Sequence, residues 1–263
     1  MYNPHAATAL ITGASSGLGE QFAYALAHQK FALVLTARRE KRLAAIAVKA
    51  KELGARCIEI IPVDLTRRDA SKEISHKLND AHIEVDYLVN NAGFGTCGKF
   101  DQLPLARELE EVDVNVTAIV ALTRLMLPAM IRRGHGTIIN VASTSAFQSV
   151  PYMTTYAATK AFVLSFTEGL AGELAGTGVR VCALCPGPVR TEFQTVAQNE
   201  KGLVPASLYI DREAVVAKGI SAAARGRTVY IVGALNFGAA QLTRLLPRAL
   251  VNRLAREVFR PCC

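Results

Sequence analysis

The sequence has few cysteines, and it lacks both an evident membrane-spanning run and an evident export signal. Its six cysteines are scattered over 263 residues, too sparsely for a dense disulfide framework, which suits a reducing compartment. The uncharged run over 228–243 contains Asn236, Gln241 and two glycines, and it falls short of the roughly 20 apolar residues that cross a bilayer. Residues 1–7 lack a basic segment and a long apolar stretch. We therefore expect a cytoplasmic protein without a signal peptide or a transmembrane segment.

The histidines and cysteines also lack the spacing of a metal site. The five histidines are His5, His28, His76, His82 and His135, and they show no ligand spacing. Cys182 and Cys185 form a CxxC pattern, but they lie in an expected strand, where residues three apart point to opposite faces. We expect two buried structural cysteines and no metal.

Positive charge is concentrated near the C-terminus. The net charge is +8, and from Arg225 onward there are seven arginines and one acid, Glu257. The rest of the chain is close to balanced, which weakens any interpretation of the whole protein as a nucleic-acid binder. We expect no nucleic-acid partner.

What the sequence does contain is a regular alternation of short apolar segments and helical patterns. The apolar segments lie at 7–13, 31–37, 56–64, 85–93, 136–143, 179–187 and 228–233. Such alternation is typical of a parallel sheet covered by helices on both faces. Right-handed crossovers then give a doubly wound α/β sheet of about seven strands flanked by helices. No long linker, repeat or low-complexity segment interrupts 1–263, so we expect a single domain.

Three glycines follow the first expected strand. In TALITGASSGLGEQFA, Gly13, Gly17 and Gly19 separate the strand from a helix. Glycine lets the backbone turn sharply and approach a pyrophosphate, while the helix N-terminus offers unpaired amides and a partial positive charge. The spacing TGxxxGxG predicts phosphate binding, and the alternative is a tight strand-to-helix turn alone.

Two arginines follow the second expected strand, where folds that select NAD often carry an acid for the ribose 2′-hydroxyl. Arg38 and Arg39 stand at the start of a helix, where the helix dipole disfavours cations. A 2′-phosphate would compensate their charge, so the pattern favours NADP over NAD. The alternative is a solvated run of surface charge.

A phenol and an ammonium lie four residues apart in PYMTTYAATKAF, at Tyr156 and Lys160. On a helix this spacing places both on one face, where an opposite charge lowers a tyrosine pKa by about 1 to 3 units. Such a tyrosine can donate a proton to a carbonyl oxygen and take it back. Ser143 ends an apolar strand, where ligands bind in open parallel sheets. Taken alone, the alternatives are an ordinary surface pair and a turn-capping serine.

Together these motifs resemble the short-chain dehydrogenase/reductase family over residues 7 to about 232. The resemblance is carried by TGASSGLG at 12–19, Asp64-Leu65, NNAG at 90–93, Asn115 in DVNVTA, Ser143, YAATK at 156–160 and PGPVRT at 186–191. It implies a Rossmann fold and hydride transfer, with a catalytic tetrad of Asn115, Ser143, Tyr156 and Lys160.

The resemblance also implies a role for each of these residues. Tyr156 is the acid/base, and Ser143 orients and polarises the substrate oxygen. Lys160 binds the nicotinamide ribose and lowers the tyrosine pKa, while Asn115 helps to hold a proton-relaying water. Asp64 meets the adenine, Asn90 lines the cofactor cleft, and Val189 and Thr191 fix the carboxamide. The full cofactor-binding set is Gly13, Ser15, Ser16, Gly17, Leu18, Gly19, Arg38, Arg39, Asp64, Leu65, Asn91, Ala92, Gly93, Tyr156, Lys160, Pro186, Gly187, Val189 and Thr191.

Three loops beyond the strand ends, 94–103, 144–153 and 190–212, are expected to choose the substrate. They supply Phe94, Phe100, Phe147, Tyr152 and Phe193, which predicts a largely apolar pocket, and 190–212 is expected to act as a lid. We expect an NADP-dependent oxidoreductase that interconverts a ketone and a secondary alcohol on a hydrophobic acyl, steroid-like or lipid-like substrate. The alternative is a nucleotide-sensing or scaffold protein with little turnover.

The segment 236–263 is a basic amphipathic extension. Apolar residues recur at helical intervals with arginines between them, and Pro247 is expected to divide the run into two helices. It can lie on an anionic membrane surface or cover an apolar substrate entrance; alternatively, it packs on its own domain or on a partner subunit. The family resemblance implies a homodimer or homotetramer, with contacts at 104–132 and 153–176.

Overall fold

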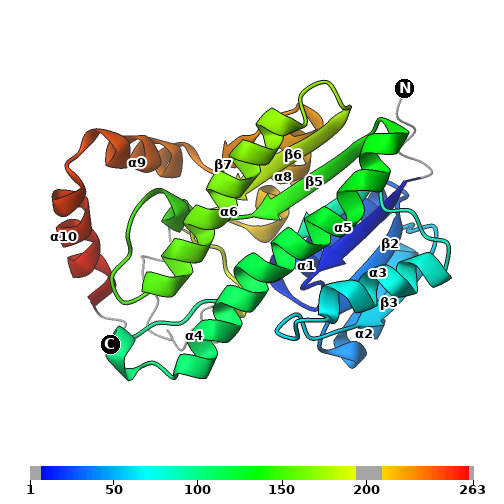
Figure 1. Ribbon diagram of the computed structural model, residues 1–263, viewed down its shortest axis with the longest axis horizontal. Helices are drawn as coiled ribbons and strands as arrows, with labels where there is room; N and C mark the ends of the chain where they lie inside the picture. Colours follow the sequence, from blue (N-terminus) through cyan, green and yellow to red (C-terminus); the bar gives the residue numbers. More distant parts are fainter. Residues whose placement is uncertain (1–6, 194–208, 261–263) are drawn as a thin grey trace.

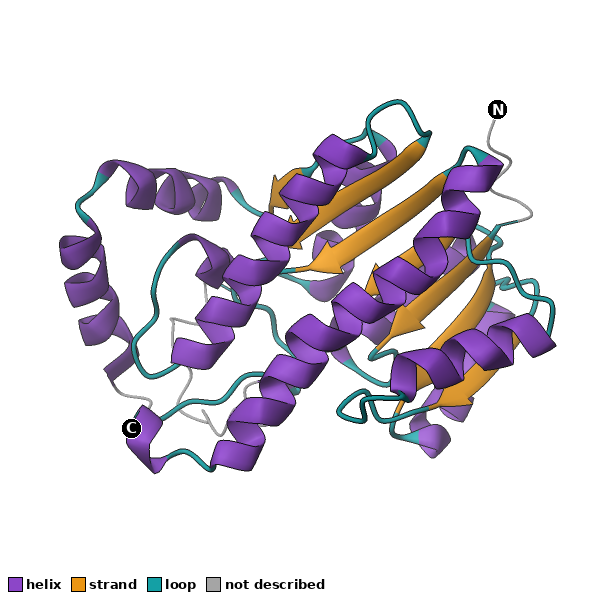
Figure 2. Cartoon of the chain, viewed as in Figure 1, coloured by secondary structure: helices purple, strands orange, loops and turns teal. Residues whose placement is uncertain are grey.

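The protein folds into a seven-stranded parallel sheet with helices on both faces (Figures 1 and 2). The computed structural model describes residues 7–193 and 209–260. The strands are β1 (Thr8–Thr12), β2 (Ala32–Ala37), β3 (Ile58–Pro62), β4 (Tyr87–Asn90), β5 (Gly136–Val141), β6 (Val179–Cys185) and β7 (Val229–Ile231). The helices are α1 (Gly17–His28), α2 (Glu40–Glu52), α3 (Ala70–Asp80), α4 (Leu105–Val112), α5 (Ala118–Arg133), α6 (Thr154–Glu173), α8 (Arg212–Ala224), α9 (Ala234–Leu245) and α10 (Arg248–Phe259). The predicted doubly wound α/β class is confirmed.

Alternation along each strand divides the core into two layers. In β1, Ala9 and Ile11 point to the side of α1, α2 and α8, whereas Leu10 points to the side of α3, α5 and α6. The second set of helices lies in front of the sheet in Figure 1. Because both faces of a parallel sheet are covered, its strands are apolar at nearly every position.

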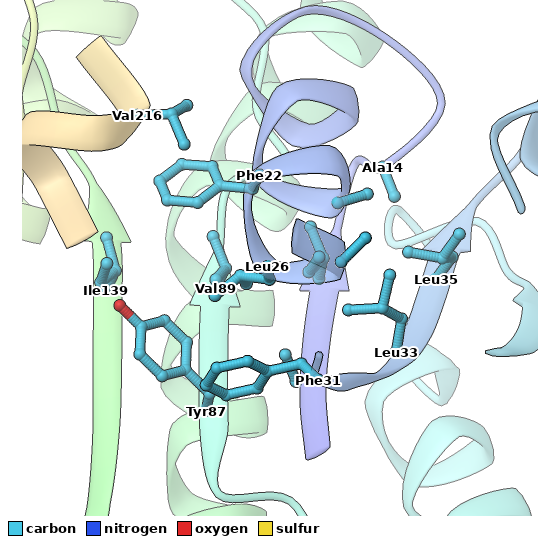
Figure 3. Close-up of a cluster of buried hydrophobic side chains, with 14 of the residues drawn as sticks. Ala14, Phe22, Leu26, Phe31, Leu33, Leu35, Tyr87, Val89, Ile139 and Val216 are labelled. Carbon is cyan, nitrogen blue, oxygen red and sulfur yellow. The ribbon is translucent and has the colours of Figure 1, made fainter. Parts of the chain in front are cut away.

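The layer behind the sheet is built around aromatic side chains from α1, from the connection before β2, and from β4. Phe22 of α1 is fully buried, and Figure 3 shows it between Val216 of α8 and the strands. Phe31 and Tyr87 pack edge to face, with ring centroids 5.7 Å apart. This packing fixes α1, and with it the turn that precedes α1, against the sheet.

The strand order β3-β2-β1-β4-β5-β6-β7 creates a switch point between β1 and β4. The chain leaves β1 toward β2 and β3 and then crosses to β4 on the other side. In open α/β sheets, ligands bind in the crevice outside the carboxyl ends of the strands at such a point.

The segment Leu105–Arg133 is long and apolar enough, by length and composition, to cross a membrane. In the fold, however, its buried residues Leu122, Met126 and Met130 pack in the core layer in front of the sheet. The helical path is interrupted by one π-helical turn, η3 (Asp113–Thr117), between α4 and α5. We therefore assign this segment to the core rather than to a bilayer.

The tail forms two helices that meet at Pro247, as the sequence predicts. In Figure 1, α9 and α10 form an orange and red arm on the side of the molecule opposite β2 and β3. The Thr243 hydroxyl donates to the carbonyl oxygen of Phe147 at 3.2 Å, and Nδ2 of Asn252 donates to the Ser149 hydroxyl at 3.0 Å. The arm is thus tied to the loop that follows β5.

Cys182 and Cys185 are both free and buried, as expected for structural cysteines. Their thiols lie within β6, in the middle of the packed layers, so burial raises both pKa values to about 12. Thiols at that pKa are protonated near neutral pH and are poor nucleophiles.

Candidate active site

A cleft of about 450 Å³ opens at the carboxyl ends of the central strands. Its walls include most of the residues that the sequence predicts for cofactor and catalysis. Those that line it are Gly13, Ser15, Ser16, Gly17, Leu18, Arg38, Arg39, Asp64, Leu65, Asn91, Ala92, Gly93, Ser143, Tyr156, Lys160, Pro186, Gly187, Val189 and Thr191. Gly19 and Asn115 belong to the same predicted set but do not line the cleft.

The turn from β1 into α1 has the geometry that a phosphate group requires. Gly13 and Gly17 have φ of 63° and 60°, in the left-handed region that favours glycine. A Cβ on Gly19 would lie 2.2 Å from the carbonyl oxygen of Gly13, so the close approach needs glycine. Ser16, the N-cap of α1, makes no capping bond through its side chain. The first helical amides therefore remain available to an anion such as a pyrophosphate.

Asn91 fastens this turn to the end of β4. Its Nδ2 donates to the backbone oxygens of Thr12 and Gly13, at 2.8 and 3.3 Å. Its backbone N–H donates to the Thr12 hydroxyl at 3.0 Å. The NNAG motif therefore holds the glycine turn in place as well as lining the cleft.

Asn90 points away from the cleft, so the expectation that it lines the cofactor site is wrong. It is 1% exposed, and its Nδ2 donates to Oδ1 of Asn140 at 2.9 Å and to the Thr123 hydroxyl at 3.2 Å. Neighbouring residues in an extended chain point to opposite sides, so only Asn91 of the pair reaches the cleft.

Arg38 and Arg39 line the cleft at the end of β2. The guanidinium of Arg39 donates to the hydroxyl and the backbone oxygen of Ser15, at 3.2 and 3.3 Å, and it pairs with Glu192 at 2.8 Å. The guanidinium of Arg38 lies 3.8 Å from the Asp64 carboxylate. Both arginines are more than one-third exposed, so they can reach an anion that enters next to Ser15.

Tyr156 and Lys160 share one face of α6, and Ser143 lies next to them at the end of β5. Ser143 and Tyr156 both line the cleft, and the Ser143 side chain acts on the pKa of the Tyr156 phenol. The Lys160 ammonium lies 5.7 Å from the centroid of the Tyr156 ring and donates to the carbonyl oxygen of Val141 at 2.8 Å. The fold thus brings a hydroxyl, a phenol and an ammonium to the same part of the cleft.

The protein by itself does not lower the pKa of the Tyr156 phenol. Enclosure of the phenol raises its pKa to about 12, the Ser143 side chain acts in the opposite direction, and the Glu111 carboxylate adds to the rise. Burial lowers the pKa of Lys160 to about 8. The expectation of a depressed phenol pKa weighed the neighbouring charge alone, whereas desolvation of the phenol is the larger effect here.

Asn115 lies behind the cleft wall, on the π-helical turn η3, and it is fully buried. The Phe94 N–H donates to its Oδ1 at 3.1 Å, and its Nδ2 donates to the Phe94 carbonyl oxygen at 2.8 Å. Nδ2 also donates to the Thr159 hydroxyl at 3.0 Å. The π turn, a feature that is frequent at functional sites, therefore joins the loop after β4 to α6 beside Lys160.

Comparison with known proteins matches this site and fold to one family. Residues 7–202 match the family model described as short chain dehydrogenase. The chain belongs to the short-chain dehydrogenase family. It is accordingly an oxidoreductase, and the predicted family resemblance is confirmed.

Three relatives illustrate the range of this short-chain dehydrogenase family. The chain is 33% identical to the ketoacyl reductase HetN of Nostoc sp. (strain PCC 7120) over 91% of its own length and 82% of that protein. The solved structure of a short-chain dehydrogenase from Sphingobium yanoikuyae in complex with NADPH has a TM-score of 0.81 and 32% identity, covering 91% and 93% of the two chains. A short-chain dehydrogenase/reductase from Burkholderia phymatum in complex with NAD also has a TM-score of 0.81, with 25% identity and coverage of 92% and 94%.

The cleft of this short-chain dehydrogenase is apolar next to Tyr156. Phe94, Met153, Phe193 and Phe259 line it, and the ring centroids of Phe193 and Tyr156 lie 5.2 Å apart. Phe100, Phe147 and Tyr152 do not line the cleft, contrary to expectation. Of the predicted lid 190–212, the part at 194–208 lies outside the described residues.

Glu111 is a residue of the site region that sequence reasoning missed. It is fully buried on α4, one helical turn before Asn115, and its charge acts on both Tyr156 and Lys160. The available signal was its place four residues before Asn115, on the same helix face. The charged run RELEEVD at 107–113, to which Glu111 belongs, instead predicts a solvent-exposed helix surface.

Proposed function

We propose that this short-chain dehydrogenase uses NADP to interconvert a ketone and a secondary alcohol on a hydrophobic substrate. The observation that carries the proposal is that Tyr156, Ser143 and Lys160 line one cleft together with apolar side chains next to Tyr156. Apolar walls bind a hydrophobic molecule, and a proton donor beside them can protonate its carbonyl oxygen.

In this proposal each of the four predicted catalytic residues has its own role. Ser143 and Tyr156 hold the substrate oxygen, and Tyr156 gives it a proton during reduction or takes the proton back during oxidation. The Lys160 charge favours loss of the phenolic proton, and Lys160 would hold the nicotinamide ribose. Asn115 fixes the loop at Phe94 and α6 relative to one another. When bound, the nicotinamide cofactor supplies or accepts the hydride.

The preference for NADP over NAD rests on the arginines that follow β2. Arg38 and Arg39 line the cleft where a carboxylate would hold a 2′-hydroxyl, and guanidinium groups bind phosphates strongly. The NADPH complex of the Sphingobium relative supports this choice. The NAD complex of the Burkholderia relative shows that the family alone does not decide it.

We also propose a homodimer or homotetramer, built through α4, α5 and α6. Leu105 and Leu109 on α4 are 70% and 56% exposed, and Phe162 on α6 is 40% exposed. Such side chains are typical of the apolar core of an interface between copies. A cytoplasmic location, a single catalytic domain over 1–263 and a lid at 190–212 remain predictions that go with this function.

Purified protein with NADPH or NADH and a panel of apolar ketones tests the function. We expect loss of reduced-nicotinamide absorbance with NADPH and bulky apolar ketones, and little with small polar ketones. Tight NADPH binding without turnover of any ketone would favour the alternative, a nucleotide sensor or scaffold. Failure to bind NADPH would overturn the cofactor assignment.

A further inference from the structure

The two tail helices, α9 and α10, carry many exposed apolar residues. On α9 and α10 these residues, which we call the tail face, are Leu235, Leu242, Leu245, Leu250, Leu254 and Val258. Leu245 and Leu235, at 81% and 79%, are the most exposed large apolar side chains in the described part of the chain. An exposed apolar group of this size marks an interaction site rather than ordinary surface.

The core of the protein does not need these side chains, because α10 has a separate inward row. Val251 and Ala255 are buried, and Phe259, next in the same row, lines the cleft. Leu250, Leu254 and Val258 form a second, exposed row at the same spacing of four residues. Each of them comes one residue before a member of the inner row. The inner row holds the helix in place, which leaves the outer row free for a partner.

Arginines flank the exposed row. Arg244, Arg248, Arg253, Arg256 and Arg260 are all exposed, and the single acid within 234–260, Glu257, pairs with Arg260 at 3.4 Å. Such a surface can bind hydrocarbon through its apolar side chains and anions through its arginines.

This charge disfavours a second copy of the chain as the occupant. In a symmetric dimer the same patch meets itself, so the five arginines would face five more with one acid per copy to offset them. An anionic lipid surface satisfies both chemistries, because leucines enter the acyl boundary while arginines meet the head groups.

We infer that α9 and α10 dock this protein on the surface of an anionic membrane through the tail face. The helices lie in the membrane plane, and the chain does not cross the bilayer at this face. The arm in Figure 1 stands at one end of the molecule, where a flat surface can reach it.

The docked orientation places the cleft next to the lipid. Phe259 lines the cleft from the inner row of the same helix whose outer row meets the bilayer. A hydrophobic ketone dissolved in the membrane would therefore approach Tyr156 along α10. This last step rests on the proposed function, whereas the docking itself does not.

Vesicle co-sedimentation of the full chain tests the docking without any substrate. We expect binding to vesicles of phosphatidylcholine with phosphatidylglycerol, weak binding to phosphatidylcholine alone, and release by salt. The triple variant Leu245→Ser, Leu250→Ser, Leu254→Ser and the triple variant Arg244→Gln, Arg253→Gln, Arg256→Gln should each partition roughly tenfold less. The matched control Val48→Ser, Phe100→Ser changes apolar residues that are 64% and 63% exposed, outside both the tail and the proposed interface between copies, and should bind as the wild type does.

Three results would overturn the docking. The wild type could fail to bind anionic vesicles, or the control could lose binding as much as the tail variants do. Alternatively, sedimentation velocity could show that the leucine variant converts a dimer into a monomer while vesicle binding is unchanged, which would make the tail face a contact between copies. Unchanged thermal melting confirms that the variants are folded without any turnover measurement, so a failed docking and a failed function give different results.

Discussion

The Glu111 carboxylate accepts two hydrogen bonds from Thr96, one from the backbone N–H and one from the hydroxyl, both at 2.9 Å. Both bonds use Oε2, and Oε1 is buried with no hydrogen-bond partner among the described residues. Burial raises the pKa of Glu111 to about 7; the bonds from Thr96 and the Lys160 charge oppose the rise, and Glu108 adds to it. A buried carboxyl beside Tyr156 and Lys160 therefore changes charge near neutral pH.

We expect Glu111→Gln to reduce the pH dependence of stability between about pH 4.5 and 7. The folded pKa lies above the unfolded one, so the carboxyl favours the folded state fully below the unfolded pKa, and this contribution is lost as pH rises through the folded pKa. A difference of about 2.5 units corresponds to about 3 kcal/mol. Denaturant unfolding at a series of pH values measures it.

Glu110→Gln is the matched control for this change, because Glu110 is partly exposed and pairs with Arg107 at 2.8 Å. Its unfolding curve should follow the wild type at each pH. If the Glu111→Gln and wild-type stabilities ran parallel from pH 4.5 to 7, the carboxyl would not titrate within the fold as described.

Tyr156→Phe should lower turnover by about 10²- to 10⁴-fold while NADPH binding persists. The substitution keeps the ring and its packing on Phe193 but removes the proton that the carbonyl oxygen receives. Steady-state rates and NADPH titration by fluorescence separate the two effects. Tyr152→Phe, a tyrosine outside the cleft lining, serves as the control and should stay active; a fully active Tyr156→Phe enzyme would rule out the acid/base role.

Arg39→Ala should raise KM for NADPH by roughly tenfold or more and leave KM for NADH little changed. A hydrogen bond to a charged group contributes about 1.5 to 3 kcal/mol, and only the 2′-phosphate distinguishes the two cofactors. The control is Arg42→Ala, since Arg42 also approaches Glu192, at 3.9 Å, but does not line the cleft. Equal losses with NADPH and NADH would assign Arg39 to the common part of the cofactor.

Gly19→Ala should abolish nucleotide binding and destabilise the protein. The added Cβ would meet the Gly13 carbonyl oxygen at 2.2 Å and Nδ2 of Asn91 at 2.5 Å, so the turn must open. Gly169→Ala in α6 meets nothing within 4 Å and should instead stabilise the helix by up to about 1 kcal/mol. Thermal melting with and without NADPH compares them, and similar melting of both variants would contradict the close approach at Gly19.

The fold could be predicted from the sequence because its signals are local. Each strand carries an apolar run bounded by polar or glycine residues, and crossover handedness reduces the possible topologies. The same holds for the glycine turn and for Tyr156 with Lys160, where spacing along one helix face is sufficient.

Features that depend on how distant segments pack could not be predicted in this way. Asn90 and Asn91 look equivalent in the sequence, and only the direction of β4 separates them. Glu111 lies in a charged run, yet its position on α4 directs its side chain into the core. The pKa of Tyr156 depends on how far the folded chain desolvates the phenol, which spacing along one helix does not report.

The cleft lining runs from Gly13 to Phe259, so an unfolded chain has no such cleft. Any molecule that fits it binds the native state alone and, by mass action, stabilises that state by about 2.7 kcal/mol at a hundred times its dissociation constant. Melting temperature is therefore a direct readout of fit, and a thermal-shift screen of nucleotides and ketones can rank candidates before any reaction is observed.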